Sequence, residues 1–150
     1  MTIGYEGLDL DRFFALLRNG RVDTIVDVRQ NPLSRKKGFS RNALTTAACE
    51  NGFRYVHLRE FGCPKDIRDD YRSDGDWSRY TERYLAYLDT LDAPLALLTR
   101  RALSTRCCLL CFEADPDTCH RSFVAARVAE IADVPLAVVH LGATDRAMPV

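Results

Sequence analysis

Short apolar runs alternate with longer amphipathic segments along this chain, and the alternation constrains the fold more than any other feature. Residues 24–28, TIVDV, and residues 107–112, CCLLCF, are almost continuously apolar, as buried parallel strands are. Between these two runs, Trp77, Tyr80 and Tyr84 recur at helical spacing, which is typical of the buried face of a helix. Strands that alternate with helices predict an α/β fold, with a mostly parallel sheet of about five strands flanked by helices.

Local start and stop signals place the remaining elements. Strands are expected at residues 3–5, 24–28, 53–58, 107–112 and 136–140. Helices are expected between Asp9 and Gly20, from Ser40 through Cys49, after the cap Asp76, from Pro94 through about Leu103, and after Thr118 with Val124, Val128 and Ile131 buried. Residues 59–76 lose the periodicity and are expected to form a long loop in which a helical turn can occur. The whole chain, residues 1–150, is then expected to be a single three-layer domain.

The charge balance argues against a strong electrostatic field over the whole protein. Basic and acidic residues number 21 each, so the formal net charge is zero. Nucleic-acid-binding domains usually carry a basic excess, so the zero net charge disfavours nucleic acid as the partner. A site for an anionic ligand must therefore be a local patch of basic side chains.

The start of the chain and its cysteines indicate a compartment. The segment MTIGYEGLDL lacks the basic and apolar regions of a secretion signal, and no apolar run approaches the length that spans a membrane. Six cysteines without such a signal indicate reduced thiols rather than a disulfide framework. We therefore expect a cytoplasmic protein that has no membrane partner.

Polar side chains follow the ends of several predicted strands. Asp27 and Arg29 close the second strand, His57 lies near the end of the third, and Cys111 and Glu113 end the fourth. The carboxyl ends of parallel strands lie along one edge of a sheet, and ligands of open α/β folds bind outside that edge. The sequence therefore predicts a functional site there.

The stretch CFEADPDTCHRS, residues 111–122, carries the densest set of reactive side chains and connects the fourth strand to its helix. The first turn of that helix offers unpaired backbone N–H groups and the positive end of the helix dipole, to which Arg121 would add a planar fork of donors for an anion. A cysteine at such a terminus has a stabilised thiolate and is a better nucleophile. The predicted catalytic residues are Cys111, Glu113, Cys119 and His120. The predicted ligand-binding residues are Asp27, Arg29, Ser34, Arg35, Tyr55, His57 and Arg121.

Several alternatives stay open for these residues. Cys111 can equally be a buried strand end, and Arg121 can form an internal salt bridge with Glu113 or Asp27. Zinc binding and a Cys111–Cys119 redox couple are further alternatives, but the cysteine spacing lacks the paired short knuckles of structural zinc sites. We therefore predict no metal site, and no cofactor can be identified from the sequence.

Four motifs together resemble the prokaryotic family called domain of unknown function 488. These are TIGYEG near the start, then DVRQNPLSRKKGFS, YVHLREFGCP and LLCFEADPDTCHRS. Signature residues that this sequence keeps are Gly4, Asp27, Arg29, Pro32, Ser34, Arg35, Phe39, Tyr55, Cys111, Glu113, Cys119, His120 and Arg121. The start differs from the common histidine-serine version, since Tyr5 and Glu6 stand there. The resemblance implies an α/β fold and supplies no established reaction, and a looser similarity to rhodanese-type domains concerns layout alone.

Three functional hypotheses follow. The leading one is an enzyme or enzyme-like domain that acts on an anionic, phosphate-bearing ligand, with Arg121, Arg29 and Arg35 holding the anion. The second is a non-catalytic nucleic-acid module, in which the basic segment after the second strand contacts phosphates. The third is a ligand-sensing domain that keeps the pocket without chemistry.

Overall fold

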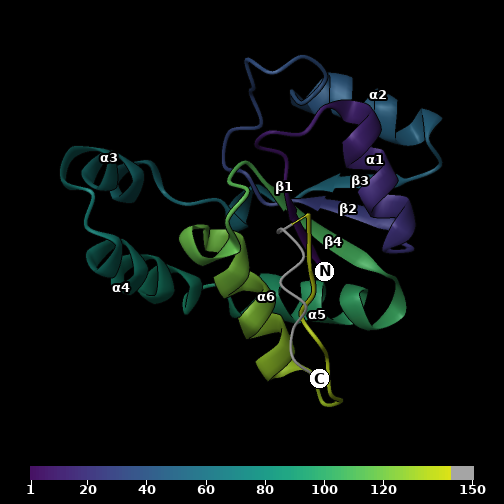
Figure 1. Cartoon of the computed structure of the whole chain (residues 1–150). Coiled ribbons are helices and arrows are strands. Elements are labelled where there is room, and N and C mark those ends of the chain that lie inside the picture. The colour runs from purple at the N-terminus through teal and green to yellow at the C-terminus, as the bar shows by residue number, and fades with distance from the viewer. Residues whose placement is uncertain (143–150) are drawn as a thin grey trace.

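The computed structural model describes residues 1–142, whose arrangement is drawn in Figure 1. The elements in chain order are β1 (Thr2–Gly4), α1 (Leu10–Asn19), β2 (Thr24–Asp27), α2 (Arg41–Glu50), β3 (Arg54–His57), η1 (Arg59–Phe61), α3 (Lys65–Asp74), α4 (Trp77–Leu88), α5 (Asp92–Ser104), β4 (Cys107–Cys111), η2 (Pro116–Thr118), α6 (His120–Ile131) and β5 (His140–Leu141). Residues 143–150 of the expected domain lie outside the described residues.

The five strands form one sheet in the order β3-β2-β4-β1-β5. Every pairing between neighbouring strands is parallel, with Asp27 opposite His57 and Gly4 opposite Cys111. The predicted α/β architecture with a parallel sheet is confirmed. The carboxyl ends of β1, β2, β3 and β4 consequently share one edge.

The strand order explains which helices cover which face. The chain moves in one direction along the sheet through α1 and α2, and then reverses on its way from β3 to β4 and β5. Right-handed crossovers that run in opposite directions place their helices on opposite faces. Figure 1 shows this arrangement, with α1 and α2 on one side of the sheet and α5 and α6 on the other.

Alternating strand residues supply the two cores. Ile25 and Cys108 pack with α1 and α2, whereas their neighbours Val26 and Cys107 pack with α4, α5 and α6. Because successive side chains of a strand point to opposite faces, a strand buried on both faces must be apolar throughout. β4, with the sequence CCLLC, is fully buried as the apolar run predicted.

Two of the predicted caps form as expected. The side chains of Asp9 and Asp76 accept hydrogen bonds from the backbone N–H groups of Arg12 and Arg79, at 2.8 and 3.0 Å. Ser40 also occupies an N-cap position, but its hydroxyl binds the backbone of Ser34 instead of the helix. It therefore fixes the basic loop between β2 and α2.

The expected loop at residues 59–76 was wrong, because this segment holds η1 and α3. Helix α3 buries only Ile67, so it has no apolar stripe that a periodicity argument can detect. Its stability comes from neighbours in space. Tyr71 packs against Trp77, and Asp70 forms ion pairs with Arg79 and Arg83 of α4.

The predicted end of the chain also needs correction. Only His140–Leu141 of the expected fifth strand joins the sheet, and His140 begins β5 opposite Thr2, at the edge away from the predicted site. The earlier part of that run instead packs Leu136 and Val138 against the core on the α5 and α6 side. Ile131, expected to be buried, is 44% exposed at the end of α6. Among the helices of residues 1–142, none combines the length and apolar character needed to cross a membrane.

Candidate functional site

A pocket of about 830 Å³ opens at the carboxyl edge of the sheet. Its wall includes Tyr5 after β1, Arg29 after β2, and Cys111 at the end of β4. β4 lies between β2 and β1. The connection that follows β4 runs over one face of the sheet, whereas the connections that follow β1 and β2 run over the other face. Ligands of open α/β sheets bind where neighbouring connections diverge in this way.

The lining combines three kinds of side chain. The basic residues are Arg29, Arg35, Lys36, Arg68 and Arg72. The aromatic residues are Tyr5, Tyr71, Trp77, Tyr80 and Phe112. The reactive residues are Cys63, Cys111, Glu113 and His120. Of the predicted site, Arg29, Ser34, Arg35, Cys111, Glu113 and His120 thus meet at one pocket.

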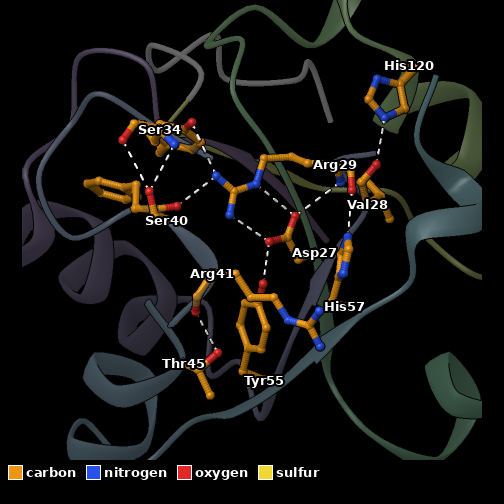
Figure 2. Close-up of polar contacts among 12 residues, drawn as sticks. Asp27, Val28, Arg29, Ser34, Ser40, Arg41, Thr45, Tyr55, His57 and His120 are labelled. Atoms are coloured by element: carbon orange, nitrogen blue, oxygen red, sulfur yellow. Dashed lines mark hydrogen bonds and ion pairs between the residues drawn. The ribbon is translucent and has the colours of Figure 1, made fainter. Parts of the chain in front are cut away.

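A buried ion pair supports the pocket below the basic loop. Asp27 accepts hydrogen bonds from Nε and Nη2 of Arg29 at 2.9 and 2.6 Å, and from the hydroxyl of Tyr55 (Figure 2). A further donor of Arg29 binds the Phe39 carbonyl oxygen at 2.8 Å. Burial alone would lower the pKa of Arg29, but the hydrogen bonds and charge of Asp27 raise it. Burial and the charge of Asp27 likewise raise the pKa of Tyr55. These contacts fix the start of the loop.

Tyr55 and His57 do not line the main pocket. They belong to a separate depression beside α2, which Arg41, Thr45 and Thr46 also line. Nε2 of His57 lies 2.7 Å from the Arg29 carbonyl oxygen, so this ring also positions the loop after β2. The expectation that Tyr55 and His57 contact the same ligand as Arg35 therefore does not fit the geometry. Asp27 is likewise fully buried and makes its contacts inside the protein.

Ser34 shapes the basic loop. Its backbone N–H donates to the Ser40 hydroxyl at 3.0 Å, and its own hydroxyl accepts from the Lys36 N–H at 3.1 Å. Within residues 1–142, the side chains of Arg35 and Lys36 have no hydrogen bond or ion pair, although Lys36 Nζ lies 5.9 Å from the Phe39 ring centre. Two cationic groups are thus held at the rim of the pocket.

Four predicted catalytic side chains meet below that rim. Glu113 Oε2 lies 3.2 Å from Cys111 Sγ and 3.1 Å from Cys119 Sγ. Nδ1 of His120 lies 3.8 Å from Cys111 Sγ, and its Nε2 lies 3.0 Å from the Val28 carbonyl oxygen. Cys111 ends β4 and His120 begins α6, with the short helix η2 between them. The turn of η2 brings together residues that the sequence spaces nine positions apart. The cluster of Cys111, Glu113, Cys119 and His120 is called the thiol cluster below.

Burial and mutual contact shift the pKa values inside the thiol cluster. For Cys119, burial would raise the pKa, but hydrogen bonds with Cys111 and His120 and the charges of His120 and Arg121 lower it well below its usual value. The pKa of Cys111 is raised by its hydrogen bond to Cys119 and by burial. Burial and the charge of Cys119 raise the pKa of Glu113. A thiolate at Cys119 is therefore the favoured anionic form of the two sulfurs.

Arg121 does not face the pocket, which corrects its predicted role as the anion-holding residue. Its side chain is fully buried. Its guanidinium donates to the carbonyl oxygens of Glu113 and Ala114, at 2.6 and 3.2 Å, and to the Thr2 hydroxyl at 3.2 Å. It therefore fixes the loop between β4 and α6. The alternative prediction for Arg121 was a salt bridge to the carboxylate of Glu113 or Asp27. This salt bridge is also absent among the described residues, because Arg121 contacts the backbone of Glu113.

The aromatic wall on α3 and α4 was missed as part of the site. Tyr71, Trp77 and Tyr80 lie against one another, with centroid distances of 5.6, 5.2 and 4.6 Å among the three rings. The helical spacing of Trp77, Tyr80 and Tyr84 in α4 predicts only a core stripe, and Tyr80 and Tyr84 are indeed buried. The polar segment that holds Arg68 falls within the expected loop of residues 59–76. No signal in the sequence showed that both segments face the carboxyl edge.

Comparison with known proteins returns one family. Residues 9–128 match the family model described as "Domain of unknown function DUF488", which covers more than half of the chain. Neither the curated proteins nor the solved structures contain a significant match to the chain.

Proposed function

Since the chain belongs to the DUF488 family, whose description names no reaction, we propose its function from the pocket itself. The protein binds a phosphate-bearing ligand with an aromatic or apolar part, and the thiol cluster acts on that ligand. The observation that carries the proposal is one pocket in which basic side chains, aromatic rings and reactive groups converge.

The basic side chains that α3 and the basic loop contribute to the pocket differ from those of α4. Arg79 and Arg83 of α4 each pair with two acidic side chains. In the pocket, Arg68 instead donates to the neutral Gln30 amide oxygen at 2.6 Å, and Arg72 reaches only Asp69, at 3.7 Å. With Arg35 and Lys36 they make a positive patch that the zero net charge conceals. Guanidinium groups suit phosphate because they offer paired donors in one plane.

The aromatic side chains on α3 and α4 can hold a planar ring of the ligand. Trp77 is half-buried and stacks on Tyr80, and both line the pocket together with Tyr71. Aromatic side chains next to cationic groups can stack with a base while the phosphates meet the cations. A nucleotide has both parts, so mononucleotides are the ligand class that fits best.

The thiol cluster supplies the chemistry. Cys111, Glu113 and His120 line the same pocket as the basic loop, so a ligand held by Arg35 and Lys36 lies over them. The Cys111 thiol lies within hydrogen-bonding distance of both the Glu113 carboxyl group and the His120 imidazole. These are groups that activate nucleophiles and transfer protons. This juxtaposition favours an enzyme-like function over a sensing module.

Emission of Trp77 provides the test, because it is the only tryptophan of the chain and lines the pocket. Titration with AMP or pyrophosphate should give a saturable change in emission. Arg35→Ala with Lys36→Ala should weaken binding by about 10-fold or more, because each removes a charge-assisted contact. The matched control is Arg100→Ala, an exposed arginine on α5 away from the pocket, which should leave the affinity unchanged.

Two outcomes would overturn the proposal. Emission that does not respond to either probe at low salt would exclude a phosphate site in the pocket. Single-stranded DNA that binds far more tightly than AMP, with a steep loss of affinity as salt rises, would assign the patch to a nucleic-acid backbone instead.

A further inference from the structure

Three potential ligand atoms of the thiol cluster lie close together, and one pair of them has the separation expected around a single metal ion. The sulfurs of Cys111 and Cys119 and a ring nitrogen of His120 all lie within 4.8 Å of one another, and all three residues are buried. Cys111 Sγ and His120 Nδ1 are 3.8 Å apart. Bond lengths of about 2.3 Å to sulfur and 2.0 Å to nitrogen place two ligands of a tetrahedral zinc ion about 3.5–3.8 Å apart.

The orientation of His120 points to a ligand independently. Its Nε2 lies 3.0 Å from the Val28 carbonyl oxygen, and Figure 2 shows the ring directed toward that group. A carbonyl oxygen only accepts, so Nε2 carries the hydrogen, and loss of the Nδ1 hydrogen on metal binding would leave its lone pair on the side of the two sulfurs. Metal-bound histidines are fixed in this manner, with the second ring nitrogen donating to a carbonyl or carboxylate.

Charge supports a divalent cation at this place. Two thiolates neutralise one divalent ion, and the Glu113 carboxylate then remains to balance the buried Arg121 guanidinium, which has no acidic side chain as a partner in residues 1–142. Without a cation, two sulfurs lie within 3.2 Å of the Glu113 carboxylate oxygen, so three groups that can each carry a negative charge are crowded together.

We propose that Cys111, Cys119 and His120 bind a zinc ion, with its fourth position on the side of Glu113. Two thiolates and an imidazole are a ligand set that zinc prefers. Three protein ligands leave one position, as in catalytic zinc sites, and Glu113 lines the pocket next to it. With zinc bound, Cys111 and His120 are metal ligands, so the chemistry proposed for the thiol cluster would pass to the metal and to Glu113. The metal site itself does not depend on what the pocket binds. Cysteine spacing alone did not predict it, because η2 creates the proximity.

Cobalt can serve as the spectroscopic probe. The full chain is reduced, stripped of metal with a chelator and titrated with Co²⁺ without oxygen. We expect uptake of one ion per chain, the visible bands of tetrahedral Co²⁺, and a thiolate-to-cobalt charge-transfer band with the intensity of two Co–S bonds. Zn²⁺ should then displace the cobalt and abolish both features. A folded, reduced protein that shows neither band would overturn the proposal.

Variants assign the ligands. Cys111→Ser, Cys119→Ser and His120→Gln should each weaken Co²⁺ binding by more than the roughly 10–100-fold loss typical of removing a residue that only hydrogen-bonds to a metal ligand. The glutamine keeps an N–H donor for the Val28 carbonyl but lacks Nδ1. Cys49→Ser removes an exposed cysteine on α2 and should bind cobalt like the parent chain. Equal cobalt affinity in the parent and in all three ligand variants would contradict the site.

A second measurement on the unmodified chain covers the case in which a variant fails to fold. Zn²⁺ should protect Cys111 and Cys119 from alkylation of the reduced protein, as located by peptide mass spectrometry. Equal labelling of both cysteines with and without Zn²⁺ would contradict the zinc site. A Cys111–Cys119 disulfide in protein that takes up no metal after reduction would also contradict it and would indicate a redox couple instead. Neither result alters the AMP titration of Trp77, so failure of the two proposals can be told apart.

Discussion

Two buried arginines lie at the carboxyl edge of the sheet, and their partners differ in kind. Arg29 faces the carboxylate of Asp27 through two parallel hydrogen bonds, whereas Arg121 binds backbone carbonyl oxygens and a hydroxyl. A planar guanidinium group with several fixed donors can bind either a carboxylate or several separate oxygen acceptors. Both arginines therefore position loops that border the pocket: Arg29 the loop after β2, and Arg121 the loop after β4.

Asp27→Asn tests the first of these tasks. The change leaves the buried Arg29 charge without its counter-ion, so the free energy of unfolding should fall by about 3–5 kcal/mol. Urea denaturation measures the loss. Asp89→Asn, which breaks the exposed pair with Arg127, should have a much smaller effect. Equal losses in the two variants would mean that the Asp27–Arg29 pair adds nothing beyond a surface contact.

At the scale of single residues, the sequence predicted which residues lie near the site better than the direction in which their side chains point. Cys111 and Glu113 are expected at one sheet edge because they follow a strand end, and His120 because it begins the next helix; the three do meet there. Arg121 lies beside them in sequence but turns into the protein, and Tyr55 and His57 face a second depression. Strand periodicity gives the side of the sheet, whereas the contacts of a loop residue depend on how the loop folds.

At the scale of elements, α3 shows where pattern recognition fails. The helix has the sequence KDIRDDYRSD, with a single buried residue, and is stabilised by its contacts with α4. It nevertheless supplies Arg68, Tyr71 and Arg72 to the pocket. Amphipathic periodicity identifies helices that cover a core, so a polar helix at the rim of a site escapes it.

The end of α3 can be tested at Gly75, which has a φ of 67° and caps the helix in the left-handed conformation. No atom lies within 4 Å of a Cβ placed there, so a substitution acts through the backbone alone. Gly75→Ala should lower the free energy of unfolding by about 1–2 kcal/mol, because that conformation brings Cβ close to a carbonyl oxygen. Gly75→Asn should cost less, since asparagine tolerates this conformation. Thermal or urea unfolding measures both, and identical values would contradict the assigned cap.

At the scale of the whole molecule, strand order determines where the site lies. The alternation of strands and helices predicted a parallel sheet, but not the position of β4 between β2 and β1. That position makes the connections diverge around β4 and opens the pocket above it. Sequence pattern cannot give the order, since pairing depends on contacts between segments distant along the chain.

Charge also has to be considered at this scale. The chain is neutral overall, yet several of its acidic residues pair with arginines on α4 and α6, whereas Arg35 and Lys36 at the rim of the pocket have no acidic partner among residues 1–142. A neutral protein can thus present a local positive site, which is the only form of anion site that the zero net charge allows.

A crystal structure of the protein grown with AMP tests the central claim most directly. We expect the phosphate between the loop that carries Arg35 and Lys36 and the Arg68 side chain on α3, with the adenine against Trp77. AMP bound elsewhere, or a pocket without nucleotide density at concentrations that saturate the Trp77 signal, would contradict it.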